Sequence, residues 1–192
     1  QIIARKIREL NVYAEIYPFS IDIDTIKSIA PNGIILSGGP SSVYTENAPI
    51  PKFDVFSLGV PVLGICYGLQ LIAYQLGGEV NKAAKREYGR ANLIIDKPDV
   101  IFDGVSQSSQ VWMSHGDSLT KIPDGFEIIA HTENAPIAAI RNQEKKIYGV
   151  QFHPEVHHSV EGIKILENFV RKICLCKEIW DMHSFVGSAI KK

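Results

Sequence analysis

One cysteine stands where an apolar run meets a helical pattern, so its sulfur could act as a nucleophile. Cys66 lies between Gly64 and Gly68, after the apolar run 60–65 and before a helical pattern over residues 67–76. This order is typical of a nucleophile elbow, here built around sulfur in place of a serine hydroxyl. The glycines allow a tight turn, and the free amides at a helix N-terminus favour a thiolate. The alternative is a buried core cysteine, because free cysteines are among the most buried residues.

A histidine and a glutamate follow a later strand pattern with the spacing of a base and its orienting carboxylate. Residues 146–152 read as a strand, and His153-Pro154-Glu155 comes next. Proline ends a strand because it cannot donate to the ladder, and extended backbone puts His153 and Glu155 on one side. The carboxylate would then fix the imidazole tautomer while the other ring nitrogen faces the thiol, as in a Cys–His–Glu triad. A single histidine at a strand end is otherwise a structural hydrogen-bonding residue, so the pairing with Cys66 carries this interpretation.

A glycine-rich loop could supply the backbone donors that acyl transfer needs. The strand pattern 33–37 is followed by Gly38-Gly39-Pro40, and such a loop can turn an N–H toward a developing oxyanion. We expect the amides of Gly39 and Tyr67 to form the oxyanion hole. An ordinary turn is the alternative. A phosphate cradle is a further reading, although the chain has neither Gly-x-x-x-x-Gly-Lys nor Gly-x-Gly-x-x-Gly.

The composition predicts one soluble globular domain. The chain has 192 residues, of which 45% are hydrophobic and 21% charged, enough for a sizeable core. Its net charge of −1 gives no electrostatic reason to expect nucleic acid or an anionic membrane as a partner. No apolar run approaches the roughly 18–20 residues that span a bilayer, and no signal peptide is visible. Three cysteines cannot all pair, which suits a reducing compartment, so we expect a cytoplasmic protein.

Helix-like and strand-like segments alternate along the chain, which predicts an α/β fold. The helical patterns cover residues 1–10, 24–30, 67–76 and 159–172, and the strand patterns cover 12–17, 33–37, 60–65 and 146–152. Short β runs between them, at 91–95, 110–113, 126–131 and 137–140, indicate an antiparallel insertion. We predict a doubly wound, mostly parallel sheet with helices on both faces and this inserted antiparallel β stretch. Ligands bind at the carboxyl ends of strands in such sheets, where all three motifs lie.

The motifs resemble those of class I (triad-type) glutamine amidotransferases. The elbow over 64–70 reads Gly-Ile-Cys-Tyr-Gly-Leu-Gln, and the base segment over 151–155 reads Gln-Phe-His-Pro-Glu. Four further segments resemble the amidotransferase domain of GMP synthetases in particular: Leu36–Val43, Arg86–Gly89, Val111–Asp117 and Val156–Ser159. The likeness covers nearly all of residues 1–176. The family's first strand is absent from this numbering, as are its ATP-pyrophosphatase and dimerisation domains.

The resemblance implies a glutaminase. Residues 1–172 would form the amidotransferase domain and hydrolyse glutamine to glutamate and ammonia through a γ-glutamyl thioester on Cys66. His153 would move the protons, and Glu155 would orient the imidazole. The residues onto which the family's glutamine pocket maps are Gln70, Ser114, His115, Gly116 and Asp117. We expect His115 to lie in a turn that shapes this pocket.

The resemblance also implies a partner for the ammonia. Residues 173–192 would form a linker toward an ATP-pyrophosphatase domain of the same enzyme, which would aminate XMP to GMP with ATP and Mg²⁺. The full-length enzyme would be a homodimer. We expect no cofactor or metal in this domain, because His157-His158 and Cys174-x-Cys176 lack further ligands at suitable spacing.

Two alternatives keep the fold and change the function. One is another cysteine hydrolase of the same fold, such as a gamma-glutamyl hydrolase; the segments Arg86–Gly89 and Ser114–Asp117 argue against it. The other is a non-catalytic regulatory module, which the intact triad argues against. The charged stretch from Lys82 to Glu87 reads either as a solvated surface or as a contact with another domain.

Overall fold

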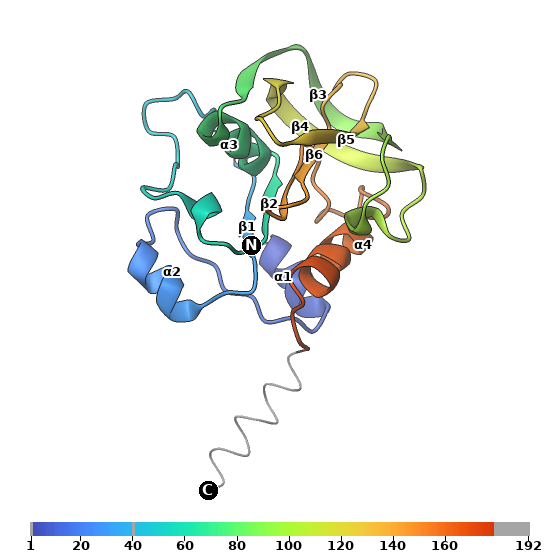
Figure 1. Ribbon diagram of the computed structural model, residues 1–192. Helices are drawn as coiled ribbons and strands as arrows, with labels where there is room; N and C mark the ends of the chain where they lie inside the picture. The colour runs from blue at the N-terminus through green and yellow to red at the C-terminus, as the bar shows by residue number, and fades with distance from the viewer. Residues whose placement is uncertain (1, 40, 179–192) are drawn as a thin grey trace, which may run out of the picture.

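A seven-stranded sheet runs through the part of the chain that this computed structural model describes, residues 2–39 and 41–178 (Figure 1). Its order is β1-β2-β7-β6-β5-β3-β4. The strands are β1 (Ile34–Leu36), β2 (Val62–Ile65), β3 (Glu79–Ile95), β4 (Ser108–Lys121), β5 (Glu127–His131), β6 (Ala139–Asn142) and β7 (Ile147–Val150). Strands β1, β2 and β7 pair in parallel, and every other pair is antiparallel. The predicted α/β class with an antiparallel insertion is confirmed, and the insertion takes a larger share of the sheet than expected.

Helices cover both faces of the parallel strands, as predicted. They are α1 (Ile2–Glu9), α2 (Ile23–Ile29), α3 (Tyr67–Leu76) and α4 (Gly162–Glu167), which continues as the π-helical segment η3 (Asn168–Ile173). The 3₁₀ turns are η1 (Val55–Ser57) and η2 (Val100–Phe102). Successive side chains of a strand point to opposite faces, so Val62 packs with Ile72 of α3, while Leu63 packs with α1 and α4 in a second core cluster. Figure 1 shows α3 on one side of the sheet and α1 beside α4 on the other.

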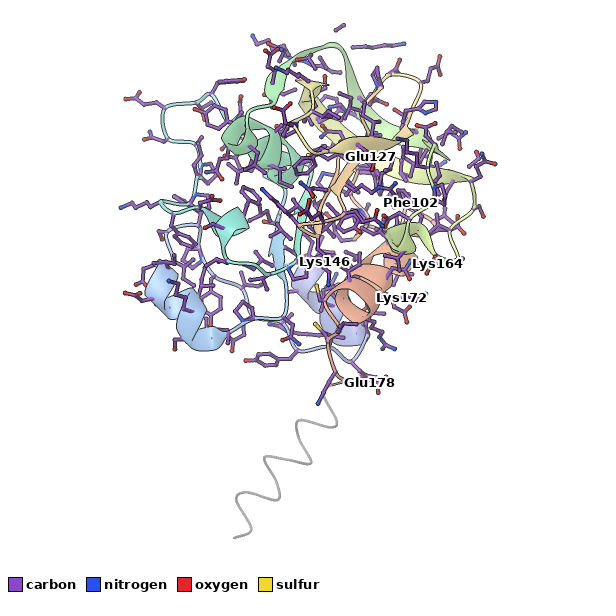
Figure 2. All side chains as sticks on the ribbon, in the orientation of Figure 1. Phe102, Glu127, Lys146, Lys164, Lys172 and Glu178 are labelled. Carbon is purple, nitrogen blue, oxygen red and sulfur yellow. The ribbon has the colours of Figure 1, made fainter. Side chains whose placement is uncertain are left out.

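The C-terminal helical segment is tied to the loop that follows η2. Lys164 Nζ donates to Gly104 O at 2.9 Å, and Lys172 Nζ pairs with Asp103 Oδ2 at 3.1 Å. Figure 2 labels both lysines on this segment and Phe102 on the neighbouring η2. The predicted helix over 159–172 begins only at Gly162, because the Ser159 hydroxyl bonds backbone groups of the preceding loop and of β4.

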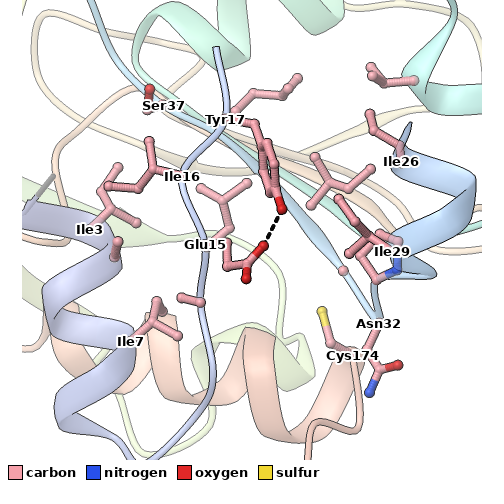
Figure 3. A pocket seen from close by; sticks show the side chains of 18 of the residues that line it. Ile3, Ile7, Glu15, Ile16, Tyr17, Ile26, Ile29, Asn32, Ser37 and Cys174 are labelled. Atoms are coloured by element: carbon pink, nitrogen blue, oxygen red, sulfur yellow. Dashed lines mark hydrogen bonds between the residues drawn. The ribbon is translucent and has the colours of Figure 1, made fainter. Parts of the chain in front are cut away.

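The segment 12–17, predicted as a strand, is not one. Within the described residues Val12 makes a single bridge, to Glu178, and the Arg8 guanidinium donates to the Ala14 carbonyl at 2.7 Å. Without a neighbouring strand, alternating side chains cannot fix extended backbone. A cavity of about 810 Å³ lies between this segment, α1 and the edge strand β1. Its lining is mainly apolar, and the Cys174 sulfur lies at its floor (Figure 3).

Strands β3 and β4 are much longer than the runs 91–95 and 110–113 that predicted them. They form a two-stranded arm in which the charged stretch of residues 82–87 belongs to β3. The expected turn at His115 is wrong, since this residue lies inside β4. Polar side chains on both faces of the arm conceal the period-2 pattern that identifies strands.

Two further expectations concern membrane-spanning helices and the C-terminal linker. No helix among the described residues is both long and apolar enough to cross a membrane. Of the predicted linker 173–192, residues 179–192 lie outside the described residues.

Candidate active site

The loop between β2 and α3 holds Cys66 in a strained conformation at the helix N-terminus. Cys66 is the N-cap residue of α3, with φ 54° and ψ −105°. A non-glycine residue with positive φ is uncommon, and such strain clusters at functional sites. A Cβ on Gly68 would lie 2.2 Å from Leu36 O, and one on Gly64 would lie 2.6 Å from the Gly68 backbone. The two glycines therefore let α3 start directly against the ends of β1 and β2, which confirms the predicted elbow.

The other two motifs converge on this cysteine. The His153 Nδ1 atom lies 2.7 Å from Glu155 Oε1, and the Glu155 carboxylate is buried. That contact leaves the second ring nitrogen of His153 for an interaction with Cys66, which also lines the cavity beside His153. Gly38 lies against both, because a Cβ there would be 2.9 Å from His153 Cε1 and 3.4 Å from Cys66 Cβ. Thiol, imidazole and carboxylate thus stand in the order that nucleophile activation requires.

The charges around His153 favour its protonated form. Burial of the ring lowers the pKa of His153, but the hydrogen bonds and charges of Cys66 and Glu155 outweigh burial and raise it to about 10. An anion next to an imidazole stabilises the imidazolium. Near neutral pH this environment therefore supports a positively charged His153 beside the sulfur, as an activated cysteine needs.

Backbone contacts fix His153 independently of its ring. Its N–H donates to Trp112 O at 2.9 Å, and its carbonyl accepts from Ser159 Oγ at 2.6 Å. The same Ser159 oxygen accepts from Trp112 N at 3.0 Å. The loop that carries the histidine is therefore pinned to the edge strand β4.

A cavity of about 630 Å³ opens beside Cys66. Its lining brings together the following sequence-predicted residues: Gly39, Cys66, Gln70, Ser114, His115, Gly116, Asp117 and His153. Lys82, Arg86 and Tyr88 of β3 also line it. Carboxylate and cationic groups on one wall can receive the amino and carboxylate ends of a free amino acid. The Tyr67 side chain points elsewhere, donating to Pro49 O at 3.2 Å.

The pocket-wall residues are bonded to one another. Gln70 Nε2 donates to Asp117 O at 3.1 Å, and His115 Nδ1 donates to the same carbonyl at 2.8 Å. Cys66 Sγ lies 3.5 Å from Ser114 O. Gly39 borders open space, and Tyr67 is the first residue of α3, where backbone N–H groups have no helical partner. Their assignment to the oxyanion hole stays a prediction.

Two polar residues near the site were missed from the sequence. Gln151 is fully buried and its Nε2 lies 3.7 Å from Cys66 Sγ; Glu87 is buried against His115. For Gln151 a signal existed, since a polar residue at the end of an apolar strand needs a partner. For Glu87 none did, because its neighbours in sequence, Arg86 and Tyr88, are both polar and exposed.

The other histidines and cysteines form no recognisable ligand set within the described residues. The His158 ring stacks on Trp112 with a centroid separation of 4.8 Å, and the His157 ring lies tilted against His158 at 4.0 Å. Cys174 packs against Gly33, and its neighbour Cys176 raises the pKa of the Cys174 thiol. In the described part of the chain, no three His, Cys, Asp or Glu side chains are grouped so as to hold a metal ion.

The fold and this site define a glutamine amidotransferase. A family model for class I glutamine amidotransferases matches residues 1–173, so the chain belongs to that family. Over all 192 residues it is 56% identical to a GMP synthase (glutamine-hydrolyzing) of Brachyspira hyodysenteriae and 53% identical to one of Aquifex aeolicus. The chain spans 37% and 38% of the lengths of these two relatives.

Solved structures agree with this assignment. A Thermoplasma acidophilum protein described as a GMP synthase subunit superposes with a TM-score of 0.81 at 32% identity, over 91% of this chain and 87% of its own. A glutamine amidotransferase of Thermotoga maritima superposes with a TM-score of 0.71 over 90% of this chain and 91% of its own. At 20% identity the second likeness speaks for the fold alone.

Proposed function

We propose that this chain is the glutaminase part of a glutamine-hydrolysing GMP synthase. The observation that carries the proposal is the assembly of Cys66, His153 and Glu155 beside a cavity, with the Nδ1–Oε1 contact at 2.7 Å. The relatives that match the whole chain support the pathway, because they are named GMP synthase (glutamine-hydrolyzing). Neither a gamma-glutamyl hydrolase nor a non-catalytic module is favoured by these relatives and this site.

The geometry supports a two-step acyl transfer. The Cys66 thiolate attacks the side-chain amide carbon of glutamine, and the amides of Gly39 and Tyr67 stabilise the oxyanion. His153 gives its proton to the amide nitrogen, the carbon–nitrogen bond breaks, and ammonia leaves a γ-glutamyl thioester. His153 then takes a proton from water, which attacks the thioester to release glutamate and the thiolate. Glu155 holds the imidazole orientation throughout.

The cavity wall supplies the recognition of glutamine. The residues proposed to contact or position it are Gln70, Ser114, His115, Gly116 and Asp117. Four of these residues belong to β4, whose backbone passes next to Cys66 at Ser114. Charged groups on this wall suit the amino and carboxylate ends of the substrate.

The ammonia would serve a second domain. The chain spans less than two fifths of the first relatives' lengths, which leaves room for an ATP-pyrophosphatase domain that aminates XMP to GMP with ATP and Mg²⁺. Residues 173–192 would link the two domains, in a cytoplasmic enzyme that is a homodimer at full length. We assign no cofactor to the amidotransferase domain itself.

Covalent labelling tests the proposal. The chain is treated with 6-diazo-5-oxo-L-norleucine, an electrophilic glutamine mimic, and analysed by intact mass spectrometry and peptide mapping. We expect one adduct, on Cys66, that glutamine prevents. Cys66→Ala should abolish both the adduct and glutamate production, whereas Cys174→Ala should retain them. Equal losses in the two variants, or no adduct even with a synthetase domain, XMP, ATP and Mg²⁺ added, would overturn the assignment.

A further inference from the structure

Glu87 and His115 form a buried pair behind the wall of the pocket. They are directly opposite each other in the β3–β4 ladder, with side chains that are 8% and 1% exposed. Residues opposite each other in antiparallel strands lie on one face and interact. His115 Nε2 is 3.4 Å from Glu87 Oε1, an ion-pair distance. The mechanism proposed above gives Glu87 no role, although burying a carboxylate is costly without one.

The pair is joined to the pocket through one carbonyl. His115 Nδ1 lies 2.8 Å from Asp117 O, which also receives Gln70 Nε2 at 3.1 Å. A carbonyl only accepts, so Nδ1 must carry a hydrogen. On the far side of the ring, the Glu87 carboxylate lies 3.4 Å from Nε2, so the His115 ring is held between Glu87 and Asp117 O.

Glu87 is itself anchored to the interior. Thr132 Oγ1 donates to Glu87 Oε1 at 3.4 Å and accepts from Ala135 N at 3.1 Å. A continuous set of contacts therefore runs from the turn after β5, through Glu87 and His115, to Asp117 O. All of its side chains are buried.

The Glu87–His115 pair lies where the β3–β4 ladder opens beside the pocket. The ladder pairs Glu87 with His115 but Lys82 with Asp117, so β3 has extra residues here and bulges away from β4. Gly116 faces this bulge, with Tyr88 Oη and Arg86 Nε near its Cβ position, and it lines the cavity. Glu87 and His115 are thus the last register pair before the ladder opens at the pocket.

We propose that Glu87 is a positioning residue for the glutamine pocket. Through His115 it holds Asp117 O and thereby the side chain of Gln70, while pinning the β4 segment beside Cys66. This inference rests on the proposed glutaminase function. It predicts that removing the Glu87 charge weakens glutamine binding more than it slows the chemical step.

Steady-state glutamate production by the whole 192-residue chain tests this inference. For Glu87→Gln we expect a rise in KM for glutamine of about tenfold and a change in kcat of less than about twofold. The matched control is Asp99→Asn, which breaks another buried ion pair, with Arg141 at 2.9 Å. None of the contacts of Asp99 lines the cavity, so the control should lower thermal stability and leave KM unchanged.

A second variant keeps the test decisive. Thr132→Val removes only the hydroxyl that anchors Glu87 and should raise KM in the same direction by a smaller factor. An unchanged KM for glutamine in both Glu87→Gln and Thr132→Val would overturn the inference. A wild type that hydrolyses no glutamine even with a synthetase domain, XMP, ATP and Mg²⁺ added would instead overturn the proposed function.

Discussion

The side-chain amide of Gln151 lies 3.7 Å from the sulfur of Cys66, and both residues are buried. The Gln151 oxygen finds no hydrogen-bond partner among the described residues. A buried amide that leaves its oxygen unpaired while directing its nitrogen at sulfur is costly for structure alone. The N–H groups of that amide add a donor beside the sulfur, which a thiolate uses better than a thiol.

Gln151→Leu should therefore make Cys66 less reactive. Replacing the amide by an apolar group of similar size removes a hydrogen-bond donor that faces the sulfur, so we expect alkylation of Cys66 to slow by about tenfold. The measurement is the second-order rate constant with iodoacetamide at about pH 7, followed by mass spectrometry. Gln110→Leu is the control, because its amide bonds His158 O outside the cavity. Equal rates in wild type and Gln151→Leu would rule out a role for the amide.

The pKa of His153 should depend on the charge of its neighbour. That pKa is raised to about 10 despite the opposing effect of burial, and Cys66 is among the groups that raise it. Cys66→Ser removes the sulfur that helps to raise this pKa and puts a neutral hydroxyl in its place, so the pKa of His153 should fall. Ring NMR between about pH 5 and 11 measures both values. A His153 titration that is the same in the variant would show that Cys66 does not act on the ring.

The raised pKa also has a consequence for stability. A histidine whose folded pKa lies above its unfolded value stabilises the fold fully below the unfolded value, here about 6.5. This contribution is lost as the pH rises from 6.5 through about 10. The free energy of unfolding of the wild type, relative to His153→Gln, should therefore decline over that range. Urea unfolding at about pH 6 and pH 10 compares the two.

The features predicted correctly from the sequence are those whose signals are local. Cys66 is marked by the flanking glycines and by the switch from a strand pattern to a helix pattern, which are β2 and α3 in the structure. His153 is marked by its place after a strand pattern, but β7 already ends at Val150, and His153 meets Glu155 through a turn and not through extended backbone. The sequence around Glu87 gives no local signal of burial. Its buried contact is with Thr132, which lies far away in the sequence. The segment 12–17 fails for the opposite reason: its alternation is local, but strand formation needs a partner.

Ser159→Ala should loosen the catalytic loop. The buried Ser159 hydroxyl donates to His153 O at 2.6 Å and accepts from Trp112 N at 3.0 Å. Alanine would leave both backbone groups without this hydrogen-bond partner. We expect a loss of about 1–3 kcal/mol in the free energy of unfolding and a lower kcat with little change in KM. Ser108→Ala is the control, since that exposed hydroxyl bonds Asn92 Oδ1 at 2.8 Å and neither residue lines the cavity. Matching effects of the two variants on kcat would contradict the anchoring role.

Replacement by alanine should change the free energy of unfolding strongly at one glycine of the site and hardly at all at another. A Cβ on Gly68 would meet Leu36 O at 2.2 Å, and because that atom is backbone, either α3 or β1 must move. Gly68→Ala should therefore lower the free energy of unfolding by about 3 kcal/mol, measured as a shift of the urea midpoint. Gly39 meets nothing within 4 Å, so Gly39→Ala should stay within about 0.5 kcal/mol of the wild type.

The same two variants separate the roles of the glycines in activity. Moving α3 displaces Cys66 at its N-terminus, so Gly68→Ala should abolish labelling by 6-diazo-5-oxo-L-norleucine even where the chain stays folded. Gly39→Ala keeps the elbow, and any loss of glutaminase activity there would come from the loop that faces the cavity. A Gly68→Ala chain that labels at the wild-type rate would mean that α3 need not start against β1 for Cys66 to react. The close approach of Gly68 to Leu36 would then serve packing and not the nucleophile.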